Sequence, residues 1–261
     1  MALFDGTARR LAERPAVLFP GDPGDALADL LRRYDPAPRA ARDRLVFGNG
    51  VLLHGPVRIT PDIERKAKLP PGMAVAYYTG VGAGARERRP DDAIWQEGER
   101  LVHGLAARLG GTVPGQRPTV KLNLEATVYS AVLLETGQVI GVLQPHVDTG
   151  ALVVDDNADV PGSYALATEE PPAFFVVYWP PRVSRSRLGR PPPALGGRLG
   201  PEPCRWLLGT RYSVADAPPG ICRKVAEAAL ALARASDGIV IDAYGFPADR
   251  PEDLLPGRLP E

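Results

Sequence analysis

The chain has 261 residues, 44% of them hydrophobic and 24% charged, which is enough to bury a sizeable core as one large domain or two small ones. Its 31 basic and 31 acidic residues give a formal net charge of zero, which argues against attraction to nucleic acid or to an anionic membrane by charge alone. Only four of the basic residues are lysine, a bias that, with abundant Ala, Gly and Pro, indicates a GC-rich bacterial genome.

Cysteine usage and hydropathy favour a cytoplasmic protein. Cys204 and Cys222 are the only cysteines and form no C-x-x-C pair, so neither a disulfide framework nor a thiolate metal site is expected. The N-terminus lacks the cationic start and apolar run of a secretory signal, and no run of 18 apolar residues predicts a membrane span. We therefore expect no membrane partner, no metal and no cofactor.

Residues 1–69 predict a first α/β segment. A short helix is expected over 5–13, and a second helix opens at Asp22-Pro23, because Asp can cap a helix and Pro fits its first position. One face of that second helix is apolar and consists of Leu27, Leu30, Leu31 and Tyr34. Strands are expected at 16–19, 45–47, 51–53 and 57–59. The hairpin between the second and third of these is signalled by Gly48-Asn49-Gly50, and 61–72 is a connector.

Residues 70–150 predict a first α+β lobe. A strand over 74–78 precedes a helix that starts near Asp91 or Asp92 and stops at Gly110-Gly111. The clearest strand covers 120–129, where apolar and polar residues alternate, so one face is buried and the other is wet or covered by polar contacts. A turn over 135–138 and a partner strand over 139–143 should follow.

Residues 151–205 read as an irregular connector, and 206–261 as a second α+β half. Residues 144–172 look irregular apart from a short strand at 152–154, and 174–178 is a strand of high β-propensity. The Pro- and Arg-rich stretch 180–203 predicts a long exposed loop. A strand over 206–214, a helix capped by Asp216 and a strand over 239–242 come next, and the tail after Pro247 is expected at the surface.

A short internal repeat bears on the architecture. Residues 105–113 align with 232–240, and each copy runs from a helix through a glycine into a strand. The order of elements predicts an α+β fold of mostly antiparallel sheet with helices on one face. If both copies are real, the chain could hold two ferredoxin-like lobes; chance similarity of so short a motif is the alternative.

His146 and Asp148 are the candidate catalytic pair. A His-x-Asp sequence in a loop could supply a general base, or two metal ligands if Asp155, Asp156 or Asp159 completed the set. The structural alternative is a surface histidine beside a solvated acidic loop, which we favour because loops carry such residues by chance.

A basic stretch is the candidate binding element. It consists of Arg182, Arg185, Arg187, Arg190 and Arg198. These side chains could contact phosphate, nucleic acid or an acidic protein. Nucleic acid is the weakest of these readings, because no aromatic residues are interleaved with the arginines, and a solvated loop in an arginine-biased chain is the alternative to all three.

Other polar residues have structural interpretations. The loop Gly80-Val81-Gly82-Ala83-Gly84 lacks a phosphate-binding fingerprint and predicts a flexible connection. Cys204 and Cys222 predict packing residues. Asp242, at the end of the last strand, predicts a polar strand end satisfied by hydrogen bonds.

Two hypotheses for function follow. The first is a non-catalytic protein that binds another protein, as an immunity-type inhibitor or an accessory or regulatory protein, since no catalytic set is assembled in the sequence. The second is an enzyme or small-molecule binder with a site between the lobes that uses His146 and nearby carboxylates. The sequence does not decide the oligomeric state.

Overall fold

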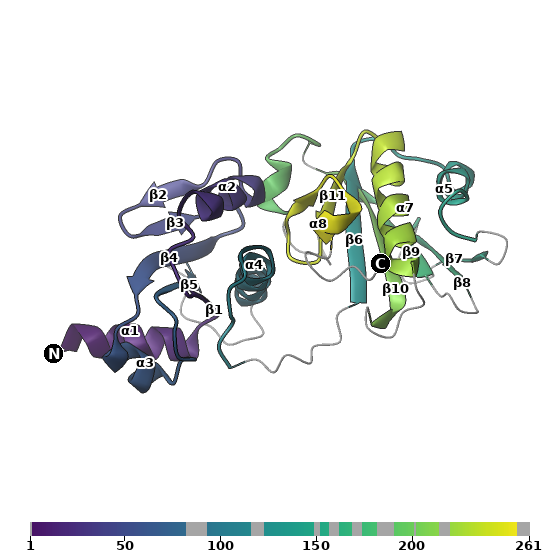
Figure 1. The fold of residues 1–261 in the computed structure, drawn as a ribbon. Helices are drawn as coiled ribbons and strands as arrows, with labels where there is room; N and C mark the ends of the chain where they lie inside the picture. Colours follow the sequence, from purple (N-terminus) through teal and green to yellow (C-terminus); the bar gives the residue numbers. More distant parts are fainter. Residues whose placement is uncertain are drawn as a thin grey trace. The chain divides into compact units, whose positions relative to one another are not determined.

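A computed structural model describes residues 2–81, 93–115, 123–148, 152–156, 162–168, 174–181, 191–200, 202–213 and 220–254 (Figure 1). The chain divides into two compact units. Unit 1 comprises residues 1–118 and 192–196, and unit 2 comprises residues 119–191 and 197–261. Within the described ranges, no helix is long and apolar enough to cross a membrane.

Unit 1 is built on a five-stranded sheet with the strand order β1-β5-β4-β3-β2, in which all neighbours are antiparallel. Its elements are α1 (Ala2–Glu13), β1 (Ala16–Phe19), α2 (Gly24–Tyr34), β2 (Arg39–Ala41), β3 (Arg44–Val46), β4 (Val51–Arg58), α3 (Pro61–Ala67), β5 (Val75–Val81), α4 (Ala93–Leu109) and the 3-10 helix η1 (Pro193–Leu195). The predicted strand at 16–19 is confirmed, and the strands predicted at 51–53 and 57–59 are one strand, β4.

Helix α2 and the hairpin of β3 and β4 are joined by polar side chains. The predicted apolar face is confirmed, because the buried residues of α2 are Leu27, Leu30, Leu31 and Tyr34. The Asn49 side-chain amide in the hairpin turn donates to Tyr34 Oη at 2.8 Å. The Asp35 carboxylate, directly after the helix, accepts from the backbone N–H of Ala37 at 2.9 Å and of Gly48 at 2.8 Å. These hydrogen bonds hold the C-terminal end of α2 against the turn between β3 and β4.

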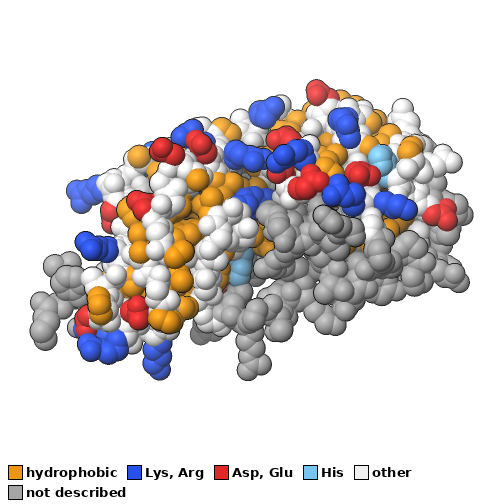
Figure 2. Space-filling model, in the orientation of Figure 1, with side chains coloured by type: hydrophobic (Ala, Val, Ile, Leu, Met, Phe, Trp, Pro, Cys, Tyr) orange, Lys and Arg blue, Asp and Glu red, His pale blue; other side chains and the backbone are white. Residues whose placement is uncertain are grey.

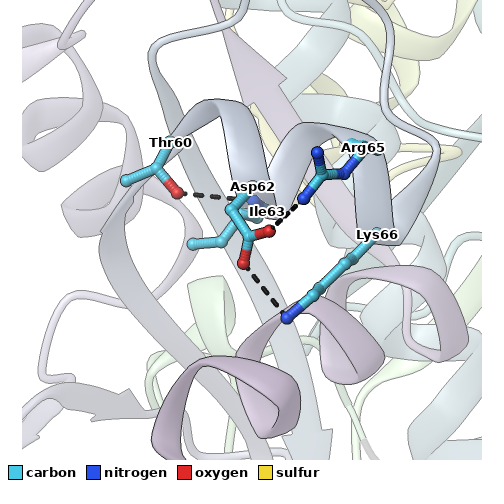
Figure 3. Close-up of polar contacts among 5 residues, drawn as sticks. All are labelled: Thr60, Asp62, Ile63, Arg65 and Lys66. Atoms are coloured by element: carbon cyan, nitrogen blue, oxygen red, sulfur yellow. Dashed lines mark hydrogen bonds and ion pairs between the residues drawn. The ribbon is translucent and has the colours of Figure 1, made fainter. Parts of the chain in front are cut away.

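Helix α3 lies in a segment predicted as a plain connector (Figure 3). Thr60 caps it by accepting from the Ile63 N–H at 3.3 Å, and Pro61 occupies the first turn. Asp62, near the positive end of the helix, pairs with Arg65 at 2.6 Å and with Lys66 at 3.1 Å. The Thr-Pro-Asp sequence is a helix start, and we missed it because the helix is only seven residues long.

Helices cover both faces of the unit 1 sheet. On one face, α1 and α3 pack side by side and enclose the sheet residues Ala16, Leu18, Ala76 and Tyr78. On the other face, α4 approaches so closely that a Cβ on its Gly98 would lie 2.7 Å from Thr79 Oγ1 of β5. Because Tyr78 and Thr79 are consecutive in one strand, their side chains point to opposite faces.

Unit 2 is built on a seven-stranded sheet with the order β12-β11-β6-β10-β9-β8-β7. Its described elements are β6 (Asn123–Ser130), α5 (Thr136–Leu143), β7 (Leu152–Asp156), β8 (Tyr164–Thr168), β9 (Phe174–Trp179), β10 (Cys204–Ser213), α7 (Ile221–Ala235), β11 (Ile239–Asp242), β12 (Pro247–Ala248) and α8 (Pro251–Leu254). All strand pairs are antiparallel. The strands predicted near 174–178, 206–214 and 239–242 are confirmed.

The predicted hairpin partner at 139–143 is wrong, because these residues belong to helix α5. A capping box starts the helix: the Glu135 side chain accepts from the backbone of Gln138, and the Gln138 side chain accepts from the Glu135 N–H at 2.9 Å. The apolar run after Gln138 is too short for periodicity to distinguish a strand from a helix. Helix α7 begins at Ile221 with Gly220 as its N-cap, and Asp216 lies outside the described residues.

The core of unit 2 lies on one face of its sheet, which we call the inner face. Helices α5, α7 and α8 all contribute buried side chains to it. The predicted alternation in β6 is confirmed there, since Leu124, Ala126 and Val128 are fully buried against these helices. Trp206 of β10 is the largest fully buried side chain of this core, and its indole N–H donates to Tyr164 Oη at 3.2 Å.

The two units share one connectivity. In unit 1 the chain runs through β1, α2, the β2–β3 hairpin, β4, α3, β5 and α4, and then returns to β1, where Leu18 and Thr112 exchange two backbone hydrogen bonds of 2.8 Å. In unit 2 it runs through β6, α5, the β7–β8 hairpin, β9, β10 and α7, and returns to β6 through β11. The order β1-β5-β4-β3-β2 therefore matches β6-β10-β9-β8-β7.

The returning turns match residue by residue. Gly110 after α4 and Asp237 after α7 both have a positive φ, of 69° and 49°. The next residues, Gly111 and Gly238, each donate to the carbonyl five residues earlier, at 3.0 and 2.7 Å, as in a Schellman motif. A Cβ on either glycine would collide with the first strand of its unit, β1 or β6. The short sequence repeat therefore falls on matching positions of the two units.

The predicted fold class, α+β with antiparallel sheets, is confirmed. Helices lie on one face of the sheet in the described part of unit 2 but on both faces in unit 1, where α1 and α3 form the second layer. The expectation of two ferredoxin-like lobes is not confirmed. In unit 1 the returning segment is a single isolated bridge, and in unit 2 the hairpin β7–β8 and strand β12 extend the sheet to seven strands.

The sequence segments divide differently from the units. Residues before 69 and after 70 share one sheet, because β4 pairs with β5. The stretch 180–203, predicted as an exposed loop, contains η1, whose three residues are buried in unit 1. The tail predicted at the surface contains α8, and Leu254 in that helix is only 1% exposed.

Candidate functional site

His146, the predicted catalytic histidine, lies in the turn after α5, where its backbone N–H donates to the Leu143 carbonyl at 2.9 Å. Its Nδ1 lies 3.8 Å from Oε2 of Glu227 in α7, too far for a hydrogen bond, and both side chains are partly exposed. The structure thus places a carboxylate near His146, but that carboxylate comes from α7. Asp148, the predicted partner, is exposed in the segment that follows.

Other predicted ligands do not assemble a centre in the described residues. Within these ranges, no group of three or more His, Cys, Asp or Glu side chains could hold a metal ion. Asp155 and Asp156 belong to β7, and Asp159 lies outside the described residues. The four predicted binding arginines also lie outside them: Arg182, Arg185, Arg187 and Arg190. Arg198, the fifth of the stretch, is exposed after η1.

The structural readings of Cys204, Cys222 and Asp242 fit their surroundings. Both thiols are buried and unpaired, and burial raises the pKa of Cys204 to about 11, so this thiol stays protonated and weakly nucleophilic. Asp242 Oδ1 accepts from the backbone N–H of Tyr244 at 2.9 Å and of Phe246 at 2.8 Å. These contacts hold the turn between β11 and β12.

The second face of the unit 2 sheet, which we call the outer face, stands out once the two units are matched. Its partly exposed side chains are Ala165, Ala167, Phe175, Val177, Trp179, Arg205 and Leu207. The strand register identifies three positions shared with unit 1. The matched pairs are Leu18 with Tyr129, Ala76 with Arg205, and Val57 with Trp179. In unit 1 these positions are apolar and lie beneath α1 and α3.

Arg205 is the centre of the outer face. It is the cross-strand neighbour of Tyr129 in β6 and of Trp179 in β9. Its guanidinium carbon lies 5.4 Å from the Tyr129 ring centroid and 5.5 Å from that of Trp179, within the range of cation–π contacts. The Arg205 Nε atom is buried and has no hydrogen-bond partner. The guanidinium is therefore positioned by two aromatic rings, and its buried Nε is not available to an acceptor from outside.

Long-range electrostatics do not single out a site. Figure 2 shows acidic and basic side chains mixed over the face it draws, in keeping with the zero net charge. Arg205 was not predicted as a site residue, because the predicted strand began at Trp206 and left Arg205 in the connector 151–205, whereas β10 begins at Cys204. The available signal was an arginine between Cys204 and Trp206, at the start of a strand whose first alternate residues, Cys204, Trp206 and Leu208, are apolar.

Comparisons of the chain with protein-family models, with curated proteins and with solved structures found no match.

Proposed function

We propose that the chain is a cytoplasmic, non-catalytic protein that binds another protein through the outer face of unit 2, as an immunity-type inhibitor or an accessory protein. The observation that supports this most is the replacement, at matching sheet positions, of buried Leu18 and Ala76 by Tyr129 and Arg205. Unit 1 shows that the same scaffold tolerates apolar residues there, so folding alone does not require the arginine.

The chemistry of the outer face indicates the partner. Phe175, Val177 and Leu207 offer partly exposed apolar surface around Arg205. Tyrosine, tryptophan and arginine are the residues that dominate binding energies at interfaces. In unit 1 the matching face receives helices, α1 and α3. The expected partner is therefore an amphipathic helix of another protein that packs on the apolar residues and presents a carboxylate to Arg205.

Site-specific photo-crosslinking tests this proposal. A photoreactive residue in place of Leu207, on the outer face, should capture one main protein in the native host. The same residue in place of Leu133 is the matched control, because Leu133 is also in unit 2, is 57% exposed and lies outside the strands of the sheet. Equal capture from both positions would contradict the proposal.

Capture is followed by a binding measurement with the purified partner. The Arg205→Met substitution keeps the length of the side chain and removes its charge, and should weaken binding about 30-fold, the effect of losing a hot-spot residue. Arg223→Met in α7 is the control, because Arg223 pairs with Glu252 on the exposed side of its helix. Unchanged affinity of Arg205→Met would overturn the assignment of the face.

A further inference from the structure

A second polar cluster lies in unit 1, on the sheet face covered by α1. His54 of β4 stacks on Tyr78 of β5, with ring centroids 4.8 Å apart and planes 6° from parallel. Nη1 of Arg10, in α1, lies 3.4 Å from Tyr78 Oη. His54 precedes a β-bulge, a feature that often re-aims side chains beside functional sites.

Gly80 makes the cluster possible by leaving space rather than by its backbone conformation. A Cβ at Gly80 would lie 2.9 Å from Nη1 of Arg14 and 3.3 Å from Nε2 of His54. Both nitrogens therefore approach the same point of the sheet. The other ring nitrogen, Nδ1 of His54, is buried and has no hydrogen-bond partner.

The surrounding charges are mainly positive. Burial is the largest cause that lowers the pKa of His54; Asp43 opposes it, and Arg44, Arg14 and Arg10 lower the pKa further. Among the described residues that influence this pKa, three guanidinium groups act on the imidazole against the carboxylate of Asp43.

The matching positions of unit 2 carry no polar side chain. His54 corresponds to Val177, Tyr78 to Leu207 and Gly80 to Gly209. At Gly209 the space is used by the Phe175 ring, 2.7 Å from where a Cβ would lie. The shared fold therefore does not require the polar cluster of unit 1.

We propose that Arg10, Arg14, His54 and Tyr78 form a binding site for a small oxyanion, the phosphate or carboxylate group of a ligand. Arginine side chains match such groups in geometry and charge, and the imidazole and phenol supply further hydrogen bonds. The site lies wholly in unit 1 and does not depend on the protein-binding function proposed for unit 2.

Titration of the full chain with inorganic phosphate at pH 7, followed by NMR of the histidine rings, tests the site. We expect saturable shifts of the His54 resonances, and a pKa of His54 that rises when the anion is bound, because the anion favours the imidazolium. A parallel titration with acetate shows which oxyanion class is preferred. If neither anion shifts the His54 resonances, or if chloride binds as tightly, the proposal is wrong.

Two variants of α1 separate a site from general charge. Arg10→Met should weaken phosphate binding about tenfold, the loss expected for one charge-assisted hydrogen bond. Arg9→Met is the matched control on the same helix, where Arg9 pairs with Glu13, and should change affinity less than twofold. His54→Phe keeps the stacking on Tyr78 but removes the ring nitrogens, and should also weaken binding. Equal effects of Arg9→Met and Arg10→Met would overturn the proposal.

Discussion

Unit 1 and unit 2 use the same connectivity but finish the second face of the sheet differently. In unit 1 the face is sealed by α1 and α3, and Leu18 and Ala76 beneath them are fully buried. In unit 2 the described helices all serve the inner face, and the outer face carries Tyr129, Trp179 and Arg205. The difference identifies the residues of the second face that the shared fold does not require.

The sheet face covered by the long helix shows which features the two units share. Each unit packs a long helix against matching strands, α4 on β1 and β5 or α7 on β6 and β10, and the chain then turns through a left-handed residue followed by a glycine. The second face differs most, because α1 and α3 cover it in unit 1 and the described helices of unit 2 all lie on the other face. Residues that depart from the shared pattern are therefore the ones to test for function.

The largest expected effect comes from moving the unit 2 residue into unit 1. Ala76→Arg would bury a guanidinium beneath α1 and α3, beside Leu11 and Ile63, and should lower the free energy of unfolding by about 4 kcal/mol or more. Urea unfolding followed by circular dichroism measures it. Ala40→Arg, on exposed strand β2, is the control and should change stability by less than about 0.5 kcal/mol. A tolerated Ala76→Arg would show that α1 and α3 do not seal this face.

Substitution of the two matched glycines by alanine should lower the stability by different amounts. Gly238→Ala would place a Cβ 2.6 Å from the Tyr129 carbonyl, which is backbone and cannot yield, so we expect a loss of about 3 kcal/mol. Gly111→Ala meets mainly the Phe19 and Val17 side chains, which can shift, and should lose about 2 kcal/mol.

Gly141→Ala in α5 is the control for the matched glycines. Nothing lies within 4 Å of the new Cβ, so this helical site should gain about 0.5–1 kcal/mol. Thermal unfolding of the three variants gives the order. If Gly111→Ala lowered the stability more than Gly238→Ala, the difference between backbone and side-chain contacts at the two turns would not determine the loss.

Arg205→Met tests whether the arginine lowers the stability of unit 2, as expected for a residue that serves the proposed binding and not the fold. Methionine keeps contact with Tyr129 and Trp179 and removes a buried, unpartnered Nε, so the free energy of unfolding should rise by about 1 kcal/mol. Arg223→Met should change it by less than about 0.5 kcal/mol. A loss of 2 kcal/mol or more for Arg205→Met would make the arginine a structural residue.

The sequence predicted local structure well wherever one pattern dominated. The apolar stripe of α2 and the alternation of β6 each specified an element and its buried face. Helices α3 and α5 were missed because they are short and begin with caps rather than with a long stripe. The repeat at Gly111 and Gly238 indicated that the two units share part of their connectivity. It did not predict the pairing of β1 with β5, because these strands are far apart in the chain.

The candidate sites could not be predicted because they depend on cross-strand pairing. Arg205 is recognisable as a candidate site residue only when the strand register places it between Tyr129 and Trp179. His54 likewise becomes distinctive beside Tyr78 and beneath Arg14. No spacing along the chain encodes either neighbourhood.

A smaller effect is expected from His54 on lowering the pH. Its folded pKa is lowered below 6.5, chiefly by burial, so the unfolded chain takes up the proton more readily. This contribution to stability is complete above pH 6.5 and is lost as the pH falls below that value. His54→Phe should therefore lose less stability than the wild type between pH 7 and 5, with His146→Gln as the matched control. If the free energy of unfolding fell equally with pH in the wild type and in His54→Phe, the prediction would be wrong.

The smallest effect should come from Glu227→Gln, which probes the catalytic hypothesis for His146. The two helices in contact there, α5 and α7, have counterparts in α2 and α4, which are also in contact, so packing does not depend on this pair. At 3.8 Å and with partial exposure of both side chains, the contact should contribute less than about 0.5 kcal/mol to the free energy of unfolding. A loss above 1 kcal/mol on urea unfolding would show that Glu227 holds the imidazole in place, as a residue that orients a general base must. Unit 2 would then have a candidate catalytic histidine on its helical side in addition to the binding face proposed on its sheet.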